Sequence, residues 1–194
     1  MSAASFFSQF MSGLSTAMLL FLIASGLSLV FGVMRVINFA HGSFYMLGAY
    51  IAWQFVEWAH PSGGGFWIAV IGAALGVALL GLAVERLFFR YLYGREELYQ
   101  LLFTYALVLI LGDVAKFIWG VGQLSVSAPP ALAGSVQLFG TTEPTYNLFI
   151  IAIGPLIALF GWLVLNRSGI GRMVRAAQMD REMLDALGAN FGTL

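Results

Sequence analysis

The sequence contains no cysteine and few charged residues, and each scarcity excludes a class of protein. Without cysteine, the chain has no disulfide framework, no thiolate metal site and no thiol nucleophile. Charged residues make up 9% of the 194 residues, whereas a soluble domain carries about 25%. Hydrophobic residues make up 60%, and the mean hydropathy is +0.90. The composition therefore indicates a membrane protein.

The chain also lacks the short motifs that mark common enzyme active sites. It has no phosphate loop of the form G-x-x-x-x-G-K-[ST], no H-E-x-x-H and no G-x-S-x-G. The two histidines are His41 and His60, and a lone histidine without cysteine or acidic neighbours is a poor metal site. We therefore expect no catalytic residue and no metal site, although residue counts alone leave an intramembrane Ser–His hydrolase open.

Five apolar runs follow one another, with the charged residues between them or at their ends. A hydrocarbon core about 30 Å thick requires roughly 20 apolar residues per helix. The runs near 11–33, 37–57, 66–88, 98–119 and 146–166 satisfy this requirement. The sequence thus predicts an all-α, polytopic membrane protein, with a transmembrane domain over 1–166 and a cytoplasmic segment over 167–194.

The basic residues predict how these helices are oriented. With the N-terminus outside, every arginine falls on the cytoplasmic side, and Lys116 is the only basic residue near the outer face. Cytoplasmic loops carry the excess of Lys and Arg, so this orientation is strongly favoured over its opposite. Near the predicted outer boundary the sequence places an aromatic belt of Trp53, Trp58, Trp67 and Trp119.

Three local patterns predict contacts. Asp113 and Lys116 are three residues apart on one helix and should form an ion pair. Gly72 and Gly76 form a small-xxx-small face that should pack against another helix. The outer segment 120–145 could contain a small hairpin lying on the membrane surface.

The segment 167–194 is far more charged than the rest of the chain, yet it has one apolar face. Helical spacing aligns Ala176, Met179, Met183, Ala186 and Leu187. Asp180 fits an N-cap and Gly188 fits the position after the helix. A cytoplasmic helix of about two turns is expected. It could rest on the lipid surface or dock into a partner.

The most distinctive polar residues lie where the second apolar run begins. Asn38, His41 and Tyr45 fall at i, i+3 and i+7, beside Gly42. Polar groups in membrane helices usually face the bundle or a water-filled path, which makes these four residues candidates for a substrate pathway. Two simpler interpretations remain open: Asn38 could cap the helix, and His41 could be a structural histidine.

The segment "GLSLVFGVMRVINFAHGSFYMLGAY", residues 26–50, resembles the signature of permease subunits of branched-chain amino acid ABC importers. Three further stretches resemble the family in the same order. They are Glu85-Arg86, "LLFTYALVLILGD" over 101–113, and "GRMVRAAQMDREMLDALGAN" over 171–190. Together these stretches cover almost all of the chain.

The resemblance implies a multi-pass protein of the bacterial inner membrane that imports branched-chain or related amino acids. The implied partners are a second homologous permease subunit, two cytoplasmic ATPases, a periplasmic substrate-binding protein and membrane lipid, with no nucleic acid. ATP and Mg²⁺ would bind to the ATPases, so the chain itself would hold no cofactor and would not be an enzyme. The implied ATPase contacts are Asp180, Arg181, Met183, Leu184, Leu187 and Gly188.

The sequence departs from the family pattern in two ways. Ser43 stands where many members have an acidic residue. Members also continue for about three more spans of roughly 20 residues, so we expect the chain to be C-terminally truncated. The alternatives are a stand-alone channel or secondary transporter, or a non-functional fragment of a permease.

Overall fold

The structure is a computed structural model that describes residues 3–34, 38–59, 65–92, 95–169 and 171–172. Helices dominate it, as the composition predicts. In chain order its elements are α1 (Ala3–Met34), α2 (His41–Ala59), α3 (Gly65–Val84), the π-helical segment η1 (Glu85–Phe89), α4 (Arg90–Leu92), α5 (Glu97–Trp119), the 3₁₀ turn η2 (Pro130–Leu132), β1 (Ser135–Leu138), β2 (Thr141–Pro144) and α6 (Thr145–Arg167).

Four of the described helical stretches are long and apolar enough to cross a membrane. They are Ala3–Phe31, Gly65–Leu92, Glu97–Trp119 and Thr145–Arg167. The protein is therefore an all-α polytopic membrane protein with one small hairpin. α2 is helical but does not meet the same standard of hydropathy, since it carries His41, Gln54 and Glu57 among its 19 residues. That the run 37–57 crosses the membrane stays a prediction.

The start of α1 differs from the sequence-based expectation. The first apolar run was predicted near 11–33, but the helix begins at Ala3. The preceding residues contain several Ser and Gln side chains that lower the hydropathy without breaking a helix. At 1.5 Å per residue, the 32 residues of α1 extend over about 48 Å, which exceeds a hydrocarbon core of about 30 Å.

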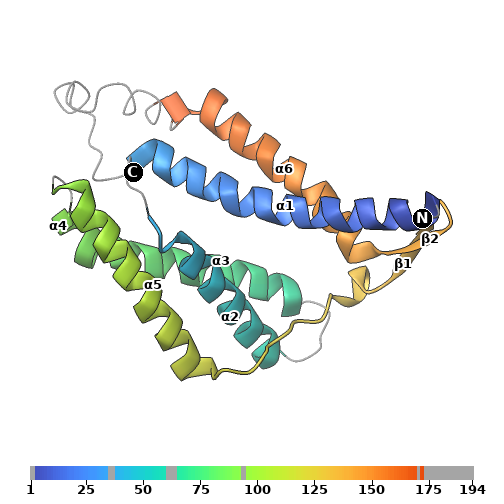
Figure 1. Cartoon of the computed structure of the whole chain (residues 1–194), viewed down its shortest axis with the longest axis horizontal. Helices are drawn as coiled ribbons and strands as arrows, with labels where there is room; N and C mark the ends of the chain where they lie inside the picture. The colour runs from blue at the N-terminus through green and yellow to red at the C-terminus, as the bar shows by residue number, and fades with distance from the viewer. Residues whose placement is uncertain (1–2, 35–37, 60–64, 93–94, 170, 173–194) are drawn as a thin grey trace.

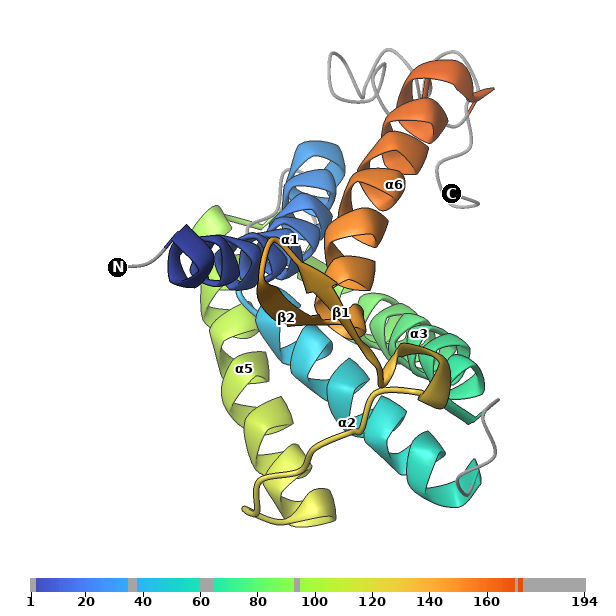
Figure 2. The same ribbon diagram turned by 90° about the vertical axis from the view of Figure 1, so that its right-hand side faces the viewer.

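The helices pack in two groups, which Figures 1 and 2 show on either side of the molecule. The first group is the α1–α6 pair, in which a Cβ at Gly154 would lie 2.8 Å from Met18 Sδ. The second is the α2–α3–α5 group, in which α2 contacts both other helices. Ala40, Phe89 and Leu107 form a buried cluster in the second group.

Glycine allows the close approach of α2 and α3. A Cβ at Gly72 would lie 2.8 Å from Phe55 Cε2, and one at Gly76 would lie 3.3 Å from Ile51 Cδ1. The predicted packing role of this small-residue face is thus confirmed. On the other side of α2, Trp119 Nε1 donates a hydrogen bond to Gln54 Oε1 at 3.2 Å, which fixes the end of α5.

The outer segment contains the short antiparallel hairpin β1–β2, which contacts both α1 and α6. Val136 pairs with Glu143 in its register. The two turn residues have positive φ, 49° at Phe139 and 79° at Gly140, as a tight two-residue hairpin turn requires. The Phe139 ring lies 5.0 Å from the ring of Phe7 in α1. A hairpin in 120–145 is confirmed.

Candidate functional site

Asn38 caps the start of α2. Its Oδ1 accepts a hydrogen bond from the Ala40 N–H at 2.9 Å, and its carbonyl oxygen accepts one from the His41 N–H at 3.3 Å. These bonds satisfy backbone donors that a helix start leaves without an intrahelical partner. Of the interpretations that the sequence left open, the capping role of Asn38 is the one its hydrogen bonds support.

The His41 side chain lies against α1. A Cβ at Gly26 would lie 3.3 Å from His41 Nε2 and 3.4 Å from Cε1. The imidazole is half-buried and fills the space that the glycine leaves in the surface of α1. The sequence does not predict this contact, because the two residues belong to different helices and neither local pattern points to the other.

Gly42 and Tyr45 are both exposed, and Tyr45 retains 55% of its accessible surface. The α2 positions that are buried are Ser43 and Leu47. The face predicted from helical spacing is thus divided in the structure: His41 contacts α1, whereas Tyr45 lies at the surface of the described part of the chain. A role of these residues in a substrate pathway stays a prediction.

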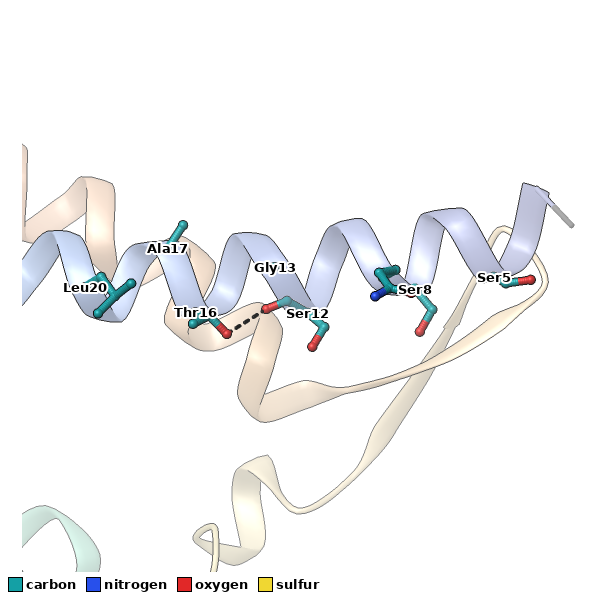
Figure 3. Close-up of a pocket in the computed structure, with 8 residues that line it drawn as sticks. Ser5, Ser8, Ser12, Gly13, Thr16, Ala17 and Leu20 are labelled. Atoms are coloured by element: carbon teal, nitrogen blue, oxygen red, sulfur yellow. Dashed lines mark hydrogen bonds between the residues drawn. The ribbon is translucent and has the colours of Figure 1, made fainter. Parts of the chain in front are cut away.

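A polar face of α1 was missed by the sequence analysis. Ser5, Ser8, Gln9, Ser12, Gly13 and Thr16 line an open depression of about 840 Å³, together with Ala17 and Leu20. Figure 3 shows Ser5, Ser8, Ser12 and Thr16 projecting from the same side of the helix. Their spacing of 3, 4 and 4 residues was the available signal, but residues 1–10 were not assigned to the helix.

Where α1 packs on α6, Met18 lies against Gly154 of α6. Ser15 is buried, and it lies seven residues after Ser8, hence on nearly the same side of the helix as the polar face. The Thr16 hydroxyl donates to the Ser12 carbonyl at 3.0 Å, which satisfies that hydroxyl within the helix. Among the described residues, those that line the depression offer hydroxyl and amide groups and no titratable side chain.

Glu143 is a second feature that the sequence did not reveal. It is 2% exposed, and in the described part of the chain its Oε1 has no hydrogen-bond partner. Its cross-strand neighbour Val136 offers no polar side chain. Sequence alone gave no reason to bury a carboxyl group in an outer loop, because its burial follows from the hairpin packing on α1 and α6.

Charged residues outside the hairpin divide between the two ends of the helices. In Figure 1 the end of α1, the short α4 and the end of α6 lie toward the same side. The arginines at these ends are Arg86, Arg90, Arg95, Arg167 and Arg172. We call this the basic end. At the other end of α5, Lys116 Nζ lies 3.1 Å from Asp113 Oδ1, which confirms the predicted ion pair.

The basic end agrees with an orientation in which it faces the cytoplasm. Three further arginines, Arg35, Arg175 and Arg181, lie outside the described residues. So do the other predicted ATPase contacts, which are Asp180, Met183, Leu184, Leu187 and Gly188. The coupling segment therefore rests on the sequence alone.

Comparison with known proteins gives a consistent result. The model of a family described as "Branched-chain amino acid transport system / permease component" matches residues 9–194. No solved structure matches the chain.

Among curated proteins, the chain is similar to the high-affinity branched-chain amino acid transport system permease protein BraD of Pseudomonas aeruginosa. The two are 28% identical over 96% of this chain and 63% of BraD. The permease proteins LivH of Salmonella typhimurium and of Escherichia coli K12 are 27% and 26% identical, each over 95% of this chain and 63% of LivH. The chain thus spans less than two thirds of the length of these relatives.

Proposed function

The chain belongs to the family of permease components of branched-chain amino acid transport systems, and we propose that it is the transmembrane permease subunit of an ABC importer. It moves branched-chain or related amino acids across the bacterial inner membrane into the cytoplasm. The observation that carries this proposal is the family match over 9–194. It is supported by helices long and apolar enough to span the membrane and by arginines gathered at one end.

The proposed transport is driven by partners. A second homologous permease completes the membrane part, two cytoplasmic ATPases bind ATP and Mg²⁺, and a periplasmic protein delivers the substrate. The chain does not hydrolyse ATP itself. Its contact with an ATPase is the predicted coupling helix, about Arg181 to Leu187, which lies on the cytoplasmic side in the proposed orientation.

A native pull-down tests the assembly. The tagged chain is solubilised gently from its host membrane, and mass spectrometry identifies the co-purifying subunits. We expect an ATPase with a phosphate-loop motif and a second permease of the same family. Recovery of the chain alone, with amino acid uptake that needs no ATP, would instead indicate a stand-alone transporter.

Leu184→Asp tests the coupling helix. A carboxylate buried in the contact without a partner should weaken ATPase recovery at least about tenfold, which corresponds to 1.4 kcal/mol. Membrane insertion should remain unchanged, since the residue lies outside the spans. The control is Gln178→Asp, which adds the same charge outside the predicted contacts. Equal ATPase recovery in both variants would show that the coupling helix is assigned wrongly.

A further inference from the structure

Within the described part of the chain, contacts that link the α1–α6 pair to the α2–α3–α5 group include two that lie at different places along the helices. The first is the contact of His41, at the start of α2, with Gly26 in the second half of α1. The second joins Trp67 and Phe149, near the starts of α3 and α6, with ring centroids 6.0 Å apart. The Gly26 contact thus belongs to the half of α1 that runs toward the basic end.

The fit at Gly26 is close. A Cβ there would lie 3.3 Å from His41 Nε2, so even an alanine would require the imidazole to move by a few tenths of an ångström, and a leucine would displace it further or separate the helices. Gly13 offers a direct comparison, because a Cβ at that position of the same helix meets no heavy atom of the described residues within 4 Å. Close approach therefore requires glycine at position 26 and not at position 13.

Both sides of this contact are anchored. The backbone of His41 is held by the Asn38 cap, and the adjacent Ala40 is 0% exposed within the cluster that contains Phe89 and Leu107. On the other side, α1 is packed along α6. The backbone on both sides of the contact is therefore held, so a side chain at position 26 that is too large for the imidazole to avoid shifts one helix group relative to the other.

We propose that Gly26 is a positioning residue: it leaves the space that the His41 imidazole occupies and thereby fixes the spacing of the two helix groups. Transport requires this spacing. The inference rests on the proposed function, because it concerns the regulation of that transport. It assigns His41 a steric role at a contact between helices.

The test is a double-mutant cycle between Gly26→Leu and His41→Ala, with Gly161→Leu in α6 as the control, because a Cβ at Gly161 also meets no heavy atom of the described residues within 4 Å. Uptake of radiolabelled leucine is measured in the assembled transporter and divided by the amount of chain in the membrane. Cysteines introduced at the exposed Ala24 and Ala49 carry spin labels that report the α1–α2 distance. The chain has no native cysteine, and the partner subunits are used in cysteine-free form.

We expect Gly26→Leu to lengthen the label distance and to lower uptake at least about tenfold, whereas Gly161→Leu changes neither. His41→Ala also lowers uptake, because it removes the imidazole that fills the space at Gly26. In the double variant the leucine fills the space of the imidazole, so the distance returns and uptake recovers to within about threefold of the original chain.

Three results would overturn the proposal. In the first, Gly26→Leu behaves like Gly161→Leu in both measurements. In the second, the double variant recovers the distance but not uptake, which would mean that the imidazole itself acts in transport. In the third, the distance changes while uptake does not. If the unmodified chain supports no uptake, the proposed function fails. The contact between Gly26 and His41 is tested separately, because an unchanged α1–α2 label distance in Gly26→Leu would refute it.

Discussion

At the scale of single residues, two side chains are held in positions that cost free energy. Phe139 has a φ of 49°, a region that bulky residues rarely adopt, and its contact with Phe7 offsets part of that cost. Glu143 is buried with one oxygen lacking a hydrogen-bond partner in the described part of the chain. Both residues belong to the hairpin, so the hairpin is held in place by its packing on α1 and α6.

Glu143→Gln should raise the stability of the protein by about 1 kcal/mol. The amide keeps the shape of the side chain but costs less to bury than a carboxylate. The apparent Tm of the detergent-solubilised chain measures this change. Thr142→Gln, at an exposed position of the same strand, serves as control and should leave the Tm unchanged. A lower Tm in Glu143→Gln would mean that the carboxyl group has a stabilising partner outside the described residues.

At the scale of elements, helix pairing depends on where one helix presents glycine to a bulky residue of another. Gly72 faces Phe55, Gly76 faces Ile51, and Gly48 faces Val77, so α2 and α3 each contribute both small and large residues. Lipid is as apolar as these side chains, and the association therefore relies on close packing rather than on hydrophobic transfer.

Gly72→Leu should separate α2 and α3 and lower stability by about 1–3 kcal/mol. A Cβ at Gly72 would already lie 2.8 Å from the Phe55 ring, so a larger side chain cannot be accommodated without movement. Gly81→Leu in the same helix is the control, because a Cβ there meets no heavy atom of the described residues within 4 Å. Phe55→Ala should recover part of the loss. Equal thermal unfolding of the two leucine variants would contradict the packing.

At the scale of the whole molecule, the distribution of arginines predicts the orientation in the membrane. The basic end carries the arginines of α4, the α4–α5 connection and the end of α6. The opposite side carries the hairpin and an exposed Lys116–Asp113 pair, which contributes little to stability because both side chains are largely solvated or interfacial. Cytoplasmic placement of the basic end follows from the excess of arginine.

Cysteine labelling in intact cells tests this orientation. Because the chain has no cysteine, Gln123→Cys and Arg95→Cys each create a single reactive thiol at an exposed position. We expect a membrane-impermeant maleimide to label position 123 directly and position 95 only after permeabilisation. The reverse pattern would require the opposite orientation, and with it a different side for the predicted coupling helix.

The sequence by itself determined the membrane character, the approximate helices and the family, and it predicts the orientation. Hydropathy, charge and motif are local properties of each segment, so they can be read without knowing the neighbours. It also placed the Asp113–Lys116 pair and the glycine face of α3, since these patterns lie within one helix. It gave Asn38, His41, Gly42 and Tyr45 as candidates but left the capping role of Asn38 as one of several interpretations.

Only the tertiary structure decided which residues of different helices meet. Contacts between residues far apart in the sequence determine three features. These are the packing of His41 against Gly26, the burial of Glu143 and the division into two helix groups. The polar face of α1 became visible once the helix was seen to begin at Ala3. Helix pairing in a membrane is set by the fit of small and large side chains across an interface, and no single segment contains that information.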